Sequence, residues 1–185
     1  MKQFLLAAAV VSMGVSALAR AQVLTGAEVS AAVYCCTSPD ELSRISTIGT
    51  SVVGSAVEFP SGSLMPLSSF YPLIPVDVDI GATTIELQYF TNQVAANAAF
   101  NGHVIRFEGA PTILGVTVNP ASTYAPLAVS FLGDAVMINS AGVLFSPDSR
   151  LVLDLVLAVP EPGTTAMLLG GLGLLGLHGW RRKQG

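Results

Sequence analysis

The feature that most constrains this chain is a two-residue hydrophobic period that recurs through residues 23–159. In segment 83–90, one face would carry Thr83, Ile85, Leu87 and Tyr89, and the other Glu86 and Gln88. Because successive side chains of a β-strand point to opposite sides, this alternation is typical of a strand with one buried face. Segment 77–80 alternates in the same way. We therefore expect a sheet protein without a long helix in this region.

Short runs of this kind are separated by turn-forming clusters, among them Asn101-Gly102. The expected strands are 28–36, 52–59, 77–80, 83–90, 103–108, 113–118, 127–132, 135–139, 142–145 and 151–157. Their number and spacing predict an all-β fold, an antiparallel β-sandwich or jelly-roll-like domain. One helical turn is expected at residues 38–41, with Ser38 as N-cap and Pro39 as its first residue. Residues 95–100 leave helix and loop open, since alanines favour a helix and the neighbouring asparagines a loop.

The amino-terminal end explains part of the high hydrophobicity of the chain. Hydrophobic residues make up 51% and charged residues 11% of the sequence, which is more apolar than an ordinary soluble protein. Residues 1–21 contain one early lysine, an apolar stretch and the small residues Ala19 and Ala21 around Arg20. This composition predicts a secretory signal peptide cleaved before Gln22. The alternative is a retained amino-terminal anchor.

The carboxyl end carries a second apolar stretch, residues 163–180, rich in Leu and Gly. A helix of these 18 residues would be about 27 Å long, close to the ~30 Å hydrocarbon core of a bilayer. The basic cluster Arg181, Arg182 and Lys183 follows it. We expect a single C-terminal transmembrane helix with this stop-transfer cluster in the cytoplasm and the domain 22–158 outside.

The middle domain is acidic. Residues 22–159 hold three arginines and eleven acidic residues, a net charge of −8 against −4 for the whole chain. Phosphate neutralisation needs clustered cations, and the domain has no basic block. Nucleic-acid binding is therefore excluded as a function.

The junction between the domain and the second apolar stretch reads Val159-Pro160-Glu161-Pro162. Followed by the transmembrane stretch and the basic tail, it resembles the PEP-CTERM sorting signal over residues 159–185. The resemblance implies an exosortase as partner, a membrane-embedded cysteine-type transpeptidase of Gram-negative bacteria that make extracellular polysaccharide. It also implies that the tail is cut near the motif and the domain passed to the outer surface or extracellular matrix of a biofilm. Export through the secretory translocon with signal peptidase is expected from residues 1–21, and anchoring in the inner membrane from residues 163–180.

The residues of the junction support cleavage there. Pro160 and Pro162 lack amide donors and hold the residues before them in extended conformations, so this segment would not join the helix. An open strip at the membrane surface is accessible to a protease. The alternative is a rigid linker before a permanent membrane anchor.

Cys35 and Cys36 are the only cysteines, and export would place them in an oxidising compartment. Three states stay open: a vicinal disulfide, buried thiols beside Tyr34, and disulfides between molecules. A vicinal bridge is strained because adjacent Cα atoms lie about 3.8 Å apart, closer than in most disulfides. Zinc is not expected, since His103 would supply only a third ligand.

Other chemical signals are weak. As a general base, His103 would need a nucleophile, and the sequence has no Gly-x-Ser-x-Gly motif to supply one. We interpret His103 as a polar residue at the start of a strand. Asp77 and Asp79 are interpreted as the wet face of a strand, because a calcium loop needs more oxygen ligands. Phe70-Tyr71, in a Ser- and Pro-rich loop, is the one aromatic pair that could be exposed and serve as a ligand platform, although phenylalanines in such a domain mostly belong to the core.

These observations predict an exported cell-surface or matrix protein with a non-enzymatic, structural or adhesive role. No catalytic residue, metal site or cofactor is expected. The first alternative is a small carbohydrate-binding module for secreted polysaccharide. The second is a secreted hydrolase whose two carboxylates meet in space, which the sequence does not reveal.

Overall fold

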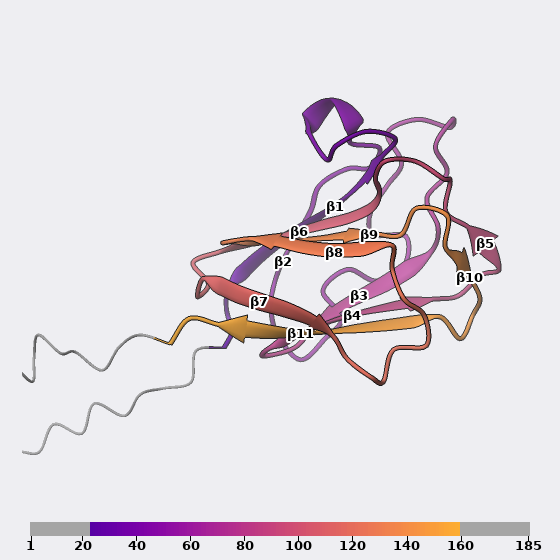
Figure 1. Cartoon of the computed structure of the whole chain (residues 1–185). Helices are drawn as coiled ribbons and strands as arrows, with labels where there is room; N and C mark the ends of the chain where they lie inside the picture. Colours follow the sequence, from indigo (N-terminus) through magenta and orange to yellow (C-terminus); the bar gives the residue numbers. More distant parts are fainter. Residues whose placement is uncertain (1–22, 160–185) are drawn as a thin grey trace, which may run out of the picture. The chain divides into compact units, whose positions relative to one another are not determined.

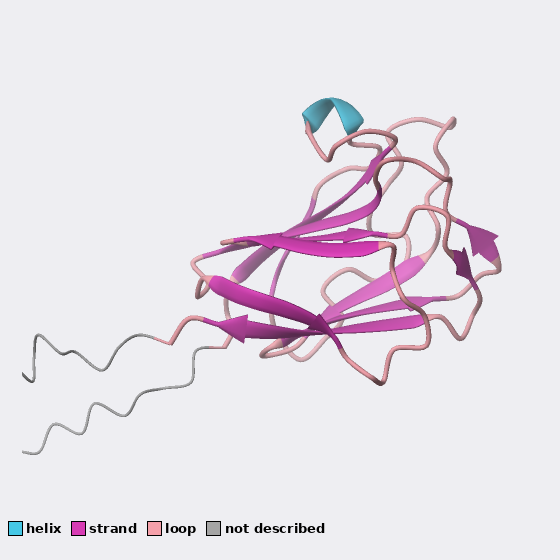
Figure 2. Ribbon diagram, viewed as in Figure 1, coloured by secondary structure: helices cyan, strands magenta, loops and turns pink. Residues whose placement is uncertain are grey.

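The alternating segments form strands in the computed structural model, which describes residues 23–159 (Figures 1 and 2). This part of the chain has eleven strands and one turn of 3-10 helix. The strands are β1 (Glu28–Cys35), β2 (Gly49–Val52), β3 (Val76–Ile80), β4 (Thr84–Tyr89), β5 (Gln93–Val94), β6 (Asn101–Glu108), β7 (Ile113–Val118), β8 (Ala128–Leu132), β9 (Ala135–Asn139), β10 (Leu144–Phe145) and β11 (Arg150–Leu157), and the 3-10 turn is η1 (Glu41–Ser43).

The strands pair into three sheets, and every pairing is antiparallel. The larger sheet has the order β2-β1-β6-β9-β8, the second β3-β4-β11-β7, and β10 pairs with β5 in a two-stranded ribbon. Figure 1 shows the two larger sheets as separate layers, with the ribbon beyond one end of them. The expected all-β, antiparallel architecture is confirmed.

One apolar core is shared by the two larger sheets, as the two-residue period requires. From β3, β4 and β11 it receives Val78, Ile80, Ile85, Leu87, Leu151 and Leu153, and from β1, β6 and β9 it receives Val29, Ile105, Phe107, Val136 and Ile138. Each such side chain contributes about 1.5–3 kcal/mol when it leaves water. The shared core makes the layering consistent with the expected sandwich.

The expected strand 52–59 is wrong. Residues 49–52 pair instead, as β2, and the chain leaves the sheet after Val52. There the Glu58 carboxylate is buried and accepts hydrogen bonds from the backbone N–H groups of Gly54 (2.8 Å) and Ile80 (2.7 Å). These bonds replace a strand ladder, and only Phe59 still forms an isolated bridge, to Val78.

The predicted Asn101-Gly102 turn is also wrong, because both residues belong to β6. Gly102 pairs with Tyr34 on one side and Asn139 on the other. A side chain at this position would collide with the backbone carbonyl of Ile138. The glycine therefore serves a close approach of strands and not a turn.

The helical turn forms, but its N-cap lies two residues later than expected. Its N-cap is Asp40, whose carboxylate accepts hydrogen bonds from the N–H groups of Leu42 and Ser43, and not Ser38. Residues 95–100, for which helix and loop were both open, form no helix and follow the short β5.

Several predictions lie outside the described residues. They are the signal peptide 1–21 with Ala19, Ala21 and Gln22, the motif residues Pro160, Glu161 and Pro162, the transmembrane helix 163–180, and the cluster Arg181, Arg182 and Lys183. Val159, the first residue of the motif, ends the described part and is exposed. Within residues 23–159 no helix has the length and hydrophobicity to cross a membrane. The domain boundaries stay a prediction.

Candidate functional site

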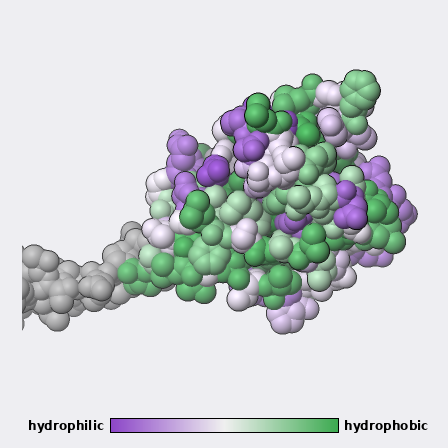
Figure 3. Space-filling model, turned by 45° about the horizontal axis from the view of Figure 1, so that its top comes forward, coloured by the Kyte–Doolittle hydropathy of each residue, from purple (hydrophilic) through white to green (hydrophobic). Residues whose placement is uncertain are grey.

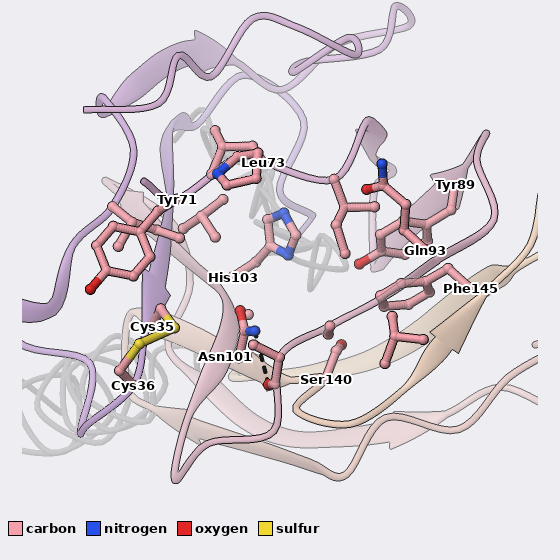
Figure 4. A pocket seen from close by; sticks show the side chains of 18 of the residues that line it. Cys35, Cys36, Tyr71, Leu73, Tyr89, Gln93, Asn101, His103, Ser140 and Phe145 are labelled. Atoms are coloured by element: carbon pink, nitrogen blue, oxygen red, sulfur yellow. Dashed lines mark hydrogen bonds between the residues drawn. A yellow bond between two sulfur atoms is a disulfide. The ribbon is translucent and has the colours of Figure 1, made fainter. Parts of the chain in front are cut away.

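A pocket of about 490 Å³ lies at the end of the larger sheet where β1 finishes and β6 begins (Figure 4). The loop through residues 70–74 and the β5–β10 ribbon complete its wall. Its lining comprises Val33, Cys35, Cys36, Ile45, Phe70, Tyr71, Pro72, Leu73, Ile74, Tyr89, Gln93, Val94, Ala95, Ala96, Asn101, Gly102, His103, Ser140 and Phe145.

A disulfide between Cys35 and Cys36 forms part of the pocket wall. Of the three states left open by the sequence, the structure contains this vicinal one. Cys35 is the buried last residue of β1, whereas Cys36 is exposed and has a φ of 86°, in the left-handed region. The Cys36 N–H donates to the Phe100 carbonyl at 2.7 Å, which ties the bridge to the segment entering β6.

His103 lies between the two sides of the pocket, with the disulfide and Tyr71 on one side and Tyr89 and Phe145 on the other (Figure 4). It is the third residue of β6, and its side chain is 5% exposed. Neither ring nitrogen has a hydrogen-bond partner among the described residues. Burial lowers the pKa of His103 from 6.5 to about 4, so the imidazole is neutral at pH 7.

Hydroxyl groups gather on the side of the pocket near the ribbon. Ser140 is 2% exposed, and its Oγ makes no hydrogen bond of normal geometry within residues 23–159, although the hydroxyls of Tyr89 and Tyr124 lie beside it. Tyr89 stacks on Phe145 with ring centroids 3.8 Å apart, and Tyr124 meets both rings edge-on. Burial raises the pKa of Tyr89 well above its usual 10 and that of Tyr124 to about 12, so both phenols stay neutral.

The predicted aromatic pair borders the same pocket. Phe70 is 88% exposed and Tyr71 47% exposed, and the Phe70 N–H donates to Ser68 Oγ at 3.0 Å. The structure thus brings together the two features that the sequence singled out separately, the cysteines and Phe70-Tyr71. Sequence analysis did not place Tyr89, Asn101 and Ser140 in a site. They come from separate segments, and no sequence spacing connects them.

Charge is absent from the pocket lining, which contains no Asp, Glu, Lys or Arg among the described residues. In the described part of the chain, no three His, Cys, Asp or Glu side chains are grouped to hold a metal ion. Asp77 accepts a hydrogen bond from the Ser61 N–H at 2.6 Å, and Asp79 is exposed. The Asp77–Asp79 segment is strand β3, so the two carboxylates do not share a loop.

Large apolar side chains are also exposed away from the pocket, on β7, β8 and β11. They are Leu114, Val118, Phe131, Leu132 and Val156. Figure 3 shows apolar and polar side chains mixed over the face that it draws, with apolar ones grouped along its lower border.

The fold and the pocket define an all-β, antiparallel protein with an uncharged, ligand-sized cavity at one end of its sheets. Comparison with protein families adds its sorting route: residues 158–183 match the model of the PEP-CTERM protein-sorting motif. The chain therefore carries a PEP-CTERM sorting signal, which indicates a secreted protein targeted to an exosortase. Neither the curated proteins nor the solved structures gave a match.

Proposed function

We propose that this protein is a cell-surface or extracellular-matrix component with a non-enzymatic, structural or adhesive role, released from its tail by exosortase. The observation that carries this proposal is the position of the sorting motif. Strand β11 ends at Leu157, and the motif match begins at residue 158. Cleavage within the Pro-Glu-Pro segment would therefore leave every described strand intact.

The pocket supports an adhesive role more than a hydrolytic one. General acid–base cleavage of a glycoside needs two carboxyl groups that face each other across the substrate. No acid lines this pocket within residues 23–159. Glu58 is held by two backbone N–H groups, and Glu86 pairs with Arg150 (Nη2–Oε2 2.6 Å).

The second candidate, a carbohydrate-binding module, belongs to the same proposal as one form of adhesion. It is favoured by Tyr71, a half-exposed ring on the pocket wall. Sugar rings stack on such surfaces because their C–H faces are apolar. A matrix protein that holds polysaccharide needs no catalytic group.

Intact-mass measurement of the protein recovered from its host tests the sorting part. The mature form is expected to lack residues 1–21 and the chain beyond the Pro-Glu-Pro segment. Replacing Pro160 and Pro162 by Ala is expected to leave the full tail in place and the protein in the membrane fraction. Asp79→Asn, a charge-removing change on the exposed face of β3, is the control and must be sorted normally.

A wild-type protein that keeps its full tail, or its amino-terminal leader inside the cell, would contradict the proposal. The non-enzymatic part has its own test. Incubation of the purified protein with the polysaccharide of its host should release no reducing ends, and their release would show a hydrolase.

A further inference from the structure

We propose that the pocket between β1, β6 and the β5–β10 ribbon binds one neutral sugar unit, with Tyr71 as its wall and His103 and Ser140 as its polar contacts. This inference rests on the proposed surface or matrix role only for the source of the sugar. The pocket itself is argued from three properties: unpartnered polar atoms, the absence of charge, and an apolar wall.

The unpartnered atoms define what the ligand must offer. Buried polar groups are almost always hydrogen-bonded in folded proteins, because an unpaired one loses its hydration without compensation. Two residues that line this pocket make no hydrogen bond of normal geometry in the described chain: His103 with both ring nitrogens, and Ser140, whose hydroxyl has those of Tyr89 and Tyr124 beside it. A neutral imidazole has one donor and one acceptor, and a serine hydroxyl is both. Sugar hydroxyls suit each of these groups, since a hydroxyl can both donate and accept.

The absence of charged side chains from the lining limits the chemical class of the ligand further. A carboxylate, phosphate or ammonium group entering this pocket would lose its hydration and find no counter-charge, because the lining has no charged side chain in the described chain. The imidazole does not supply one either, since burial keeps the pKa of His103 at about 4. Uronic acids and amino sugars are therefore disfavoured against neutral sugars.

The rest of the wall fits a ring with an apolar face. Tyr71, the disulfide and Leu73 lie on one side, and Tyr89 and Phe145 on the other (Figure 4). Asn101 and Gln93 add amide groups at the edge. The volume of about 490 Å³ lies within the ~300–1,000 Å³ of small-molecule pockets. Small-molecule sites usually combine an apolar wall with a few polar groups.

Binding can be measured on the full chain, kept soluble in a polyoxyethylene detergent, which has no sugar headgroup. The probes are the methyl pyranosides of glucose, galactose and mannose, followed by saturation-transfer NMR and calorimetry. Glucuronic acid and glucosamine serve as charged comparisons, and cyclohexanol as a ring with a single hydroxyl. We expect saturable binding of at least one neutral pyranoside and weaker binding of the comparison compounds.

Two variants test the assignment of the site. Tyr71→Ala should weaken binding about tenfold, because it removes the stacking surface. Phe131→Ala is its matched control, since Phe131 is a similarly exposed ring (40%) on β8, outside the pocket. It should leave binding within about twofold.

Ser140→Ala separates a binding role from a structural one. It should weaken binding about three- to tenfold by removing a hydrogen bond to the ligand. The melting temperature is measured in parallel, because the hydroxyls of Tyr89 and Tyr124 lie beside Ser140 in the free protein. Weaker binding at an unchanged melting temperature assigns the hydroxyl to the ligand. A merely structural serine would lower the melting temperature as well.

The proposal is overturned if no neutral pyranoside binds, if a charged sugar or cyclohexanol binds as tightly, or if Tyr71→Ala binds like the wild type. The source of the sugar is tested separately with dextran, galactan and mannan. Binding of the polymer together with its monomer supports attachment to polysaccharide. Binding of the monomer alone supports the pocket and contradicts the adhesive role.

Discussion

Replacing His103 by Leu should reduce the loss of folding stability that this protein shows as the pH falls from 7 to 4. The pKa of His103 is lowered to about 4 in the folded state by burial, against 6.5 for a solvated imidazole. Between these values the unfolded chain binds a proton that the folded chain does not, so stability falls as the pH falls. The loss amounts to about 2 kcal/mol between pH 7 and pH 5, and about 3 kcal/mol by pH 4.

Urea unfolding of the wild type and His103→Leu at pH 7 and pH 5 measures this effect. Other titrating groups contribute equally to both proteins, so the difference between their pH dependences isolates the imidazole. Leu153→Ala is the control: Leu153 is fully buried in the shared core, and its truncation lowers stability without removing a titrating group. It must keep the wild-type pH dependence.

The reasoning is refuted if His103→Leu loses as much stability as the wild type between pH 7 and pH 5. That result would mean that the imidazole is protonated inside the fold, or that water reaches it freely. No charged side chain lines either of the two cavities that His103 borders in the described chain. The pKa of the imidazole is therefore set by burial and not by a neighbouring charge.

Three further predictions concern the fold and are measured by denaturant unfolding. Gly102→Ala should cost about 3 kcal/mol, because its methyl group would meet the Ile138 carbonyl, whereas Gly115→Ala, with only Val156 side-chain atoms at 3.5 Å, should cost less than about 1 kcal/mol; equal losses would contradict the close approach. Leu153→Ala should cost about 2–5 kcal/mol and the exposed Leu144→Ala less than about 0.5 kcal/mol, and a reversed order would place the core elsewhere. Glu86→Gln should cost less than about 1 kcal/mol and still less in high salt, because its ion pair with Arg150 is partly exposed; a large, salt-independent loss would show a buried pair.

Where a short apolar run is marked at both ends by turn-forming residues, sequence reasoning located the strands. Segments 113–118 and 135–139 match β7 and β9 residue for residue, and segment 83–90 differs from β4 only at its ends. It failed where a polar side chain replaced backbone pairing. Glu58 lies in a segment that we expected to be a strand, but its carboxylate accepts hydrogen bonds from the N–H groups of Gly54 and of the distant Ile80, and no local pattern shows the second of these. The turn prediction at Gly102 was wrong for a related reason. A glycine that lets two strands approach closely cannot be told from a turn glycine in the sequence.

The site was only partly predictable, for a similar physical reason. Adjacent cysteines and an aromatic pair in a polar loop are visible in the sequence. Their meeting depends on residues 44–46, which bridge to Tyr34 beside the cysteines and to Pro66 ahead of the aromatic pair. The pairing of β1 with β6 then sets Val33 opposite His103. The neutral state of that imidazole follows from its burial, and burial arises from packing between residues far apart in the chain. A lone histidine in a sequence carries none of this information.

The disulfide also has a consequence for how the fold holds together. Cross-links stabilise proteins mainly by restricting the unfolded chain, and that restriction grows with the number of residues enclosed. Cys35 and Cys36 are neighbours in the sequence, so their bond encloses almost nothing. Unlike the staples of many small secreted domains, it leaves the denatured ensemble nearly as free as before. The stability of the folded domain therefore comes from the packing of its sheets. The disulfide contributes to the shape of the pocket wall instead.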